Sequence, residues 1–164
     1  MVCITQTAPV KVNGQVWMVI NTVDTGTRRG SIHWLRIDAA NTAIIDEGYI
    51  GDATQSFLFP SIAANHDGDV VIGFNGVGPA QVSLQAACGD RQDHRRENGL
   101  RRPDASQAWA RQLSAPNRCG NASWGDFSRT TLSPENDKTF WTIQQIAVDK
   151  THLATEITAL HSEH

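Results

Sequence analysis

The chain has 164 residues, which is enough for one domain with a substantial hydrophobic core. Its formal net charge of −3 gives no reason to expect nucleic acid or an anionic membrane surface as a partner. Uninterrupted apolar runs are only a few residues long, so the sequence predicts no membrane-spanning segment.

The N-terminal segment MVCITQTAPVKVNG lacks the basic leader and apolar core of a secretory signal. Either the protein is intracellular, or Met1 is not the start of the natural product. Three cysteines, Cys3, Cys88 and Cys119, cannot all pair within one chain. Because no CxxC spacing occurs, we expect ordinary thiols, while a Cys88–Cys119 disulfide stays open for an oxidising compartment.

Residues 1–52 predict a first four-stranded sheet. Two strands within residues 3–23 flank the turn Asn13-Gly14, where glycine tolerates the positive φ of a tight hairpin turn. Strands over 31–38 and 42–51 follow, joined by a turn at 39–41. Four consecutive strands with short connections are typical of an up-and-down antiparallel sheet.

A second sheet is predicted over residues 53–116, and the hairpin at 59–76, FPSIAANHDGDVVIGFNG, organises it. Its turn, Asp67-Gly68, is followed by an apolar strand in the same order as Asn13-Gly14. We interpret this recurrence as a repeat. The third strand of the second repeat is expected at 81–88.

The insertion at 89–106 is the one long polar stretch, and it begins GDRQDHRRENGL. Its composition predicts a solvated loop, which is either a functional loop or the product of a local reading-frame error. Residues 105–113 have helical composition. The repeat instead favours an outer strand near 109–114, and we adopt the strand.

A third sheet is predicted over residues 117–160, with strands at 127–132, 139–146 and 152–160. Residues 128–140 align with residues 61–70 if the intervening turn is three residues longer. The fold class is therefore predicted to be all-β, with about three four-stranded antiparallel blades of a β-propeller in a single partial domain. Roughly eleven strands are expected, because the last outer strand is missing.

The segment Ser133 to Trp141, SPENDKTFW, resembles the Asp-box turn S-x-D-x-G-x-T-W of sialidase-like propellers. It departs from that motif at Glu135, where the motif has Asp, and at Asp137, where the motif has Gly. In such a turn, short polar side chains bond the backbone while the aromatic packs beneath. The motif speaks for the fold and not for catalysis.

The wider pattern of NGQVWMVI, SIHWLRID, FPSIAANHDGDVVIGF, WGDFS and TFWTIQQIA resembles the C-terminal blades of secreted bacterial proteins of the sialidase-like β-propeller superfamily. The resemblance covers nearly the whole chain except residues 89–117. It implies a propeller fold and an extracellular location. Members of the superfamily are much longer, so the chain resembles only their last part.

A candidate ligand site follows from the propeller expectation, because the innermost strands deliver their leading residues to one mouth of the central channel. Asp126 and Arg129 would present charge there beside Trp124, with Phe59 and Ser61 as the equivalent positions one blade earlier. The alternative is structural: Asp126 accepts backbone N–H bonds and Trp124 packs between blades.

No catalytic, metal or cofactor site is predicted. The sialidase resemblance would require a tyrosine nucleophile backed by an acid, but the single tyrosine, Tyr49, has no evident partner in the sequence. The histidines show no HxH or HExxH spacing, and Asp67-Gly68-Asp69 is too short to form a calcium cage. We therefore expect a non-catalytic module that binds carbohydrate or protein, with a fragment of a sialidase-like glycoside hydrolase as the alternative.

Aromatic side chains in the predicted strands, namely Trp17, Trp34, Phe74, Phe140 and Trp141, are expected to pack one sheet on the next. On this basis Trp141→Ala is expected to cost about 3–5 kcal/mol. Three blades do not close a ring, so the stack would leave two apolar sheet faces bare. A homodimer could close the ring, N-terminal blades could be missing, or the chain could collapse into a sandwich.

Overall fold

The computed structural model describes residues 7–78, 82–89, 128–147 and 153–162. All regular secondary structure in these ranges is β-strand, and no helix in them is long and apolar enough to cross a membrane. The expectation of an all-β chain is confirmed. The strands are β1 (Val10–Val12), β2 (Gln15–Val23), β3 (Gly30–Asp38), β4 (Ile44–Ile50), β5 (Ser56–Ala64), β6 (Val70–Val77), β7 (Val82–Gly89), β8 (Arg129–Leu132), β9 (Thr139–Ala147) and β10 (Leu153–His161).

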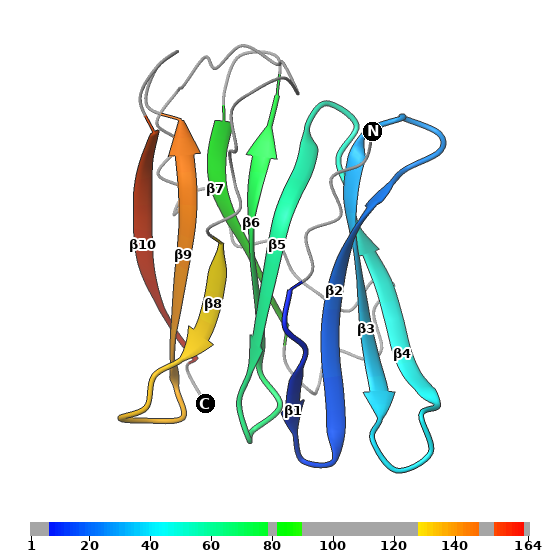
Figure 1. The fold of residues 1–164 in the computed structure, drawn as a ribbon, viewed down its shortest axis with the longest axis vertical. Helices are drawn as coiled ribbons and strands as arrows, with labels where there is room; N and C mark the ends of the chain where they lie inside the picture. The colour runs from blue at the N-terminus through cyan, green and yellow to red at the C-terminus, as the bar shows by residue number, and fades with distance from the viewer. Residues whose placement is uncertain (1–6, 79–81, 90–127, 148–152, 163–164) are drawn as a thin grey trace.

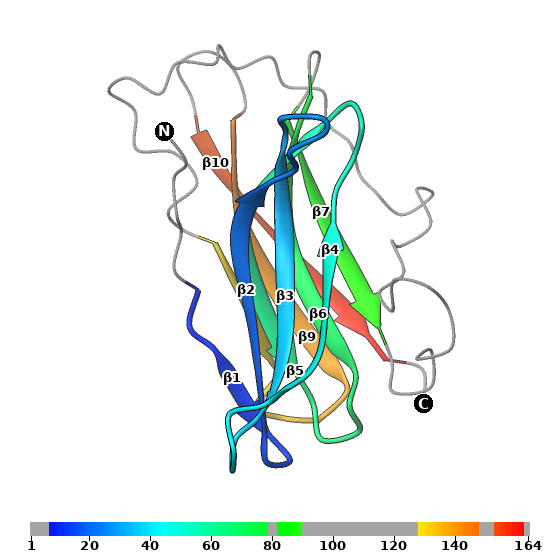
Figure 2. The same ribbon diagram turned by 90° about the vertical axis from the view of Figure 1, so that its right-hand side faces the viewer.

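These strands form three antiparallel up-and-down sheets. Sheet A has the order β1-β2-β3-β4, sheet B the order β5-β6-β7 and sheet C the order β8-β9-β10. The sheets lie side by side in the order A, B, C, with B in the middle (Figure 1). Figure 2 looks onto the outer face of sheet A, with the strands of the other two sheets behind it. The polar insertion and the strand expected near 109–114 lie outside the described residues.

The tight turns follow the predicted chemistry. Asn13 and Gly14 both adopt positive φ, 49° and 74°, as a two-residue hairpin turn between right-twisted strands requires. Gly68 adopts a φ of 96° in the turn between β5 and β6. There the Asn65 side-chain oxygen accepts the backbone N–H groups of Gly68 and Asp69, at 2.9 and 2.7 Å. The hairpins on which the repeat was based are confirmed.

We call the face of each sheet that points in the direction from sheet A to sheet C its front face. The opposite face is its back face. The front face of sheet A packs on the back face of sheet B through an apolar core. Trp17 and Trp34 lie 6.2 Å apart in this core, and Phe57 and Phe74 lie 4.8 Å apart. Burial of such large rings from both sheets is the main attraction between A and B.

The front face of sheet B meets the back face of sheet C through a smaller and more polar contact. Ala63 and Val71 pack with Phe140, while Ser61 and Thr130 share a 2.7 Å hydrogen bond. Sheets B and C approach so closely at Gly73 that a Cβ there would lie 2.1 Å from Thr142 Oγ1 and 2.7 Å from Thr130 Oγ1. Glycine is therefore required at this position by the distance between the sheets.

Strands β5 and β6 of sheet B are consequently buried on both faces. Residues 59–65 and 70–76 are all buried, without the alternation of a half-exposed strand. A strand covered on both sides has a continuous run of apolar or small residues, as SIAA and VVIGF show. By contrast, β10 alternates between exposed and half-buried positions along its whole length.

Carboxamide side chains link the front faces of sheets A and B to the backbone of the next sheet. Asn21 on β2 donates to the Phe57 carbonyl and accepts the Phe59 N–H, both at 2.9 Å. These bonds bridge the interruption of the β5–β6 ladder between Leu58 and Ser61, where Phe59 has a φ of 55°. Asn75 on β6 likewise donates to the Gln145 carbonyl of β9 at 2.8 Å.

Strand pairing corrects the alignment of the third repeat by one residue. Ala64 pairs with Val70 in sheet B, and Leu132 pairs with Phe140 in sheet C. The turn of the third repeat is therefore two residues longer rather than three. As a result Ser61 corresponds to Arg129, and not to residue 128.

The expectation that Trp141 is buried between sheets is wrong. Trp141 lies on the front face of sheet C, and 41% of it is exposed, whereas its neighbour Phe140 faces sheet B and is 1% exposed. Composition alone did not reveal that none of the described sheets covers this face. Within the described residues, exposed apolar side chains lie on both end faces, namely Tyr49 and Ile44 on sheet A and Ile157 and Leu153 on sheet C, but the face of sheet A also carries His33 and Glu47.

Phe140→Ala and Trp141→Ala test which face of β9 is buried, because their stability costs should differ. We expect Phe140→Ala to lower the free energy of unfolding by about 3–5 kcal/mol, because it opens a cavity between sheets B and C. Trp141→Ala should lower it by only about 1 kcal/mol in a single chain, because that ring is already partly in water. Denaturant unfolding at high dilution measures both values, and equal costs would contradict the assigned faces.

Candidate functional site

The described members of the predicted ligand site lie on β5 and β8. Ser61 is 1% exposed and its hydroxyl bonds Thr130 on the next sheet, so the two inner strands are brought together here. Phe59 is 7% exposed and its N–H bonds the Asn21 side chain. Both residues make contacts between sheets, and neither presents its side chain to solvent. Trp124 and Asp126 lie outside the described residues.

Arg129 is the one member of the predicted set that is exposed among those the structure describes. It is the first residue of β8 and pairs with Ile143 of β9. This pairing places it on the front face of sheet C, at the position that Ser61 occupies on sheet B. A guanidinium group here is available to a carboxylate or polar ligand.

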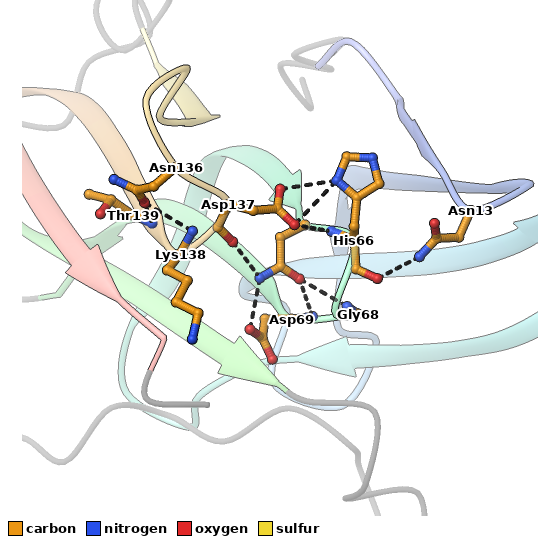
Figure 3. A network of polar contacts seen from close by, with 9 residues as sticks. Asn13, His66, Gly68, Asp69, Asn136, Asp137, Lys138 and Thr139 are labelled. Carbon is orange, nitrogen blue, oxygen red and sulfur yellow. Dashed lines mark hydrogen bonds and ion pairs between the residues drawn. The ribbon is translucent and has the colours of Figure 1, made fainter.

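A polar network joins one hairpin turn from each of the three sheets, where these turns meet at the same end of the strands (Figure 3). From sheet A, the Asn13 side chain donates to the His66 carbonyl at 2.6 Å. From sheet C, the Asp137 carboxylate accepts the His66 N–H at 2.9 Å and contacts the ring Nδ1 at 3.1 Å. The turn of sheet B is thus held from both sides, by its carbonyl and by its amide.

Asn65 completes the network from inside the middle turn. Its Nδ2 donates to the Asp137 carbonyl at 2.9 Å and to the Asp69 carboxylate at 2.8 Å. Asn136 fixes the third turn by accepting the N–H groups of Lys138 and Thr139, at 3.0 and 2.7 Å. The Asp-box-like turn is therefore bonded by short polar side chains as expected. The aromatic expected beneath it, Trp141, instead lies on an exposed face.

The Asp137 carboxylate is held in its charged form. Partial burial raises the pKa of Asp137, but the hydrogen bonds and the charge of His66 outweigh it, and the net pKa is lowered. A histidine paired with a carboxylate occurs in acid–base sites, yet here the same carboxylate also bonds the His66 backbone. The pair therefore acts as a clamp between two turns.

A second polar cluster lies on the back face of sheet A. The His33 ring stacks on the Tyr49 ring at 4.4 Å, and its Nε2 lies 2.7 Å from Glu47 Oε2. Tyr49 is 61% exposed. The sequence showed no evident partner for Tyr49, and strand pairing provides a ring contact, because it sets His33 directly opposite it. Alternation along 31–38 and 42–51 was the signal that would have placed these side chains on one face.

The described residues contain no group of three or more His, Cys, Asp and Glu side chains that could hold a metal ion. Comparisons with protein-family models, curated proteins and solved structures found no match for the chain. The resemblance to sialidase-like propellers therefore remains a prediction from the sequence blocks.

Asp137→Asn should destabilise the chain in a pH-dependent way. Because the pKa of Asp137 is lowered below its ordinary 3.8 on folding, the carboxylate adds stability above that pH and loses it as the pH falls through the lowered value. We expect a deficit of about 0.5–1 kcal/mol at neutral pH, since the pair is partly exposed. Denaturant unfolding between pH 2 and 7 should show the deficit shrinking toward zero in acid.

Glu135→Gln is the matched control, because it removes the same charge from an exposed position in the same turn. It should change the stability less than Asp137→Asn at neutral pH. A deficit of Asp137→Asn that stays constant down to pH 2 would contradict the clamp.

Proposed function

We propose that the chain is a non-catalytic β-propeller module whose sheets A, B and C are three consecutive blades, and that it binds a carbohydrate or protein ligand at the channel mouth. The observation that carries the proposal is the repeated packing of a front face on the next back face. Up-and-down order within each sheet and the Ser61–Thr130 contact between inner strands support the blade assignment.

The two described carboxyl groups whose pKa values are shifted are bonded within turns. Hydrogen bonds from the Thr27 and Gly26 backbone lower the pKa of Asp24, and the pKa of Asp137 is also lowered. The two shifted groups are thus suited to fixing turns.

The ligand site is proposed where β8 begins. Arg129 is the first residue of β8 and pairs with Ile143 in the middle of β9, where it offers an exposed guanidinium fork. Trp124 and Asp126, which precede it in the chain, complete the proposed set. Charge and an aromatic side chain together suit the polar groups and apolar ring faces of a sugar.

The alternative function, a fragment of a sialidase-like glycoside hydrolase, draws support from Tyr49 and Glu47. The two side chains share one face of β4, and His33 contacts both. However, β4 is the outer strand of sheet A, remote from the inner strands that would line a channel.

Binding to a panel of immobilised oligosaccharides, followed by titration of each hit, tests the proposal, with cross-linking to candidate proteins as the second arm. We expect at least one binder, and Arg129→Ala should weaken its affinity at least about tenfold through the loss of charge-assisted hydrogen bonds. Lys138→Ala, which removes a charge from the turn between β8 and β9, should leave the affinity unchanged.

Hydrolysis of fluorogenic glycosides decides between the two functions. Turnover that disappears in Tyr49→Phe would favour the hydrolase and overturn the non-catalytic proposal. Absence of any binder in both arms would also count against a binding module.

A further inference from the structure

One end face of the three sheets is a front face and the other is a back face. Each carries apolar side chains beside polar groups, namely Arg129 on sheet C and the cluster of His33, Tyr49 and Glu47 on sheet A. The free front face of sheet C carries Trp141 and Ile143 on β9 and Ile157 on β10. The free back face of sheet A carries Met18 and Leu35, which are paired across β2 and β3. Apolar sheet faces of this kind normally mark an interaction surface.

Register shows that the front face of sheet C repeats the front face of sheet A. If Trp17 corresponds to Trp141, then Val19 and Asn21 correspond to Ile143 and Gln145. The residues paired with these positions on the next strand are apolar in both sheets, because Val19 pairs with Trp34 and Ile143 pairs with Ile157. Trp17 is 7% exposed under sheet B, whereas Trp141 is 41% exposed.

The third position of this pattern is a carboxamide in every sheet. Asn21 and Asn75 each bond the backbone of the sheet in front of them. Gln145 occupies the same position on sheet C. The front face of sheet C thus has the residue pattern that the chain uses twice to receive another sheet.

The back face of sheet A has the matching pattern. Val16, Met18 and Ile20 correspond to Val70, Ile72 and Phe74, and these back-face residues of sheet B pack against sheet A. Within sheet A the corresponding residues are only partly buried. Among the described residues, one front face and one back face are therefore covered by no further sheet.

We propose that a second copy of the chain covers both end faces, with the front face of sheet C on the back face of the partner's sheet A, and the reverse. A second copy is the occupant that supplies both complementary faces at once. Two such contacts related by a two-fold axis would close a ring of six sheets and leave no apolar face exposed. The proposal goes beyond the proposed function and needs no ligand. It also bears on that function, because Arg129 lies on the front face of sheet C at the position of Ser61 and the partner would cover it.

Molar mass from light scattering on the purified full chain tests the proposal, over concentrations from about 0.1 to 100 μM, a range that spans typical homodimer affinities. We expect twice the mass of one chain at the upper end. A single-chain mass throughout would overturn the proposal and leave additional blades of a longer chain as the occupant. A mass that grows without limit would overturn ring closure, because a front-to-back contact that does not close makes filaments.

Charge substitutions on each face distinguish front-to-back association from its alternatives. Trp141→Lys blocks the front face and Met18→Lys blocks the back face, and each should raise the dimer dissociation constant at least about tenfold. If Met18→Lys still dimerises normally, the contact is front to front. If Trp141→Lys still dimerises normally, the contact is back to back. Either result would overturn the proposal.

Ile157→Lys and Ile44→Lys serve as second variants, because both side chains are largely exposed and their replacement leaves the core of the chain intact. Glu135→Lys, in the turn network away from both faces, is the matched control and should dimerise like the unmodified chain. Circular dichroism of every variant verifies the β-sheet content. Ligand binding is measured separately, so that failure of dimerisation and failure of the proposed function remain distinguishable.

Discussion

Burial of sheet B on both faces is the constraint on which the rest of the structure depends. The apolar side chains on its strands stay out of water only if sheets A and C remain packed on either side. The two contacts are chemically different. Large aromatic and aliphatic groups fill the contact with sheet A, whereas small and hydroxyl-bearing side chains fill the contact with sheet C. Sheet C is therefore held more by shape and hydrogen bonding than by apolar area.

Polar side chains supply the register that apolar packing alone does not specify. Asn21 and Asn75 bond the backbone of the following sheet, and Asn13 and Asp137 bond the turn at His66. Buried carboxamides are costly unless they are paired, so each acts against slippage of one sheet over the next. The contact of B with C is less completely satisfied, because Gln144 Oε1 is buried without a hydrogen-bond partner among the described residues.

Turn residues and alternation in the sequence allowed the strands and sheets to be predicted, but not which face of each sheet another sheet covers. The turns at Asn13-Gly14 and Gly68 need positive φ, which is visible in the sequence, and alternation indicated the strands between them. Burial of Trp17 and exposure of Trp141 depend instead on which sheet is last in the stack, and no local pattern carries that information. The bulge at Phe59 was missed because Asn21, which stabilises it, is distant in the chain. At the candidate site, Arg129 was identified but Ser61 proved buried, and the Asp137–His66 clamp joins turns whose proximity only the fold reveals.

A double-mutant cycle at Gly73 and Thr142 tests the burial of sheet B most directly, through its packing on sheet C. Gly73→Ala alone should lower the free energy of unfolding by about 3 kcal/mol or more, because its Cβ overlaps Thr142 Oγ1. Thr142→Ala should cost roughly 1–2 kcal/mol by itself, yet the two changes together should recover at least about 1 kcal/mol relative to their sum. Strictly additive costs would mean that these residues do not meet, and would contradict the packing of sheet B on sheet C.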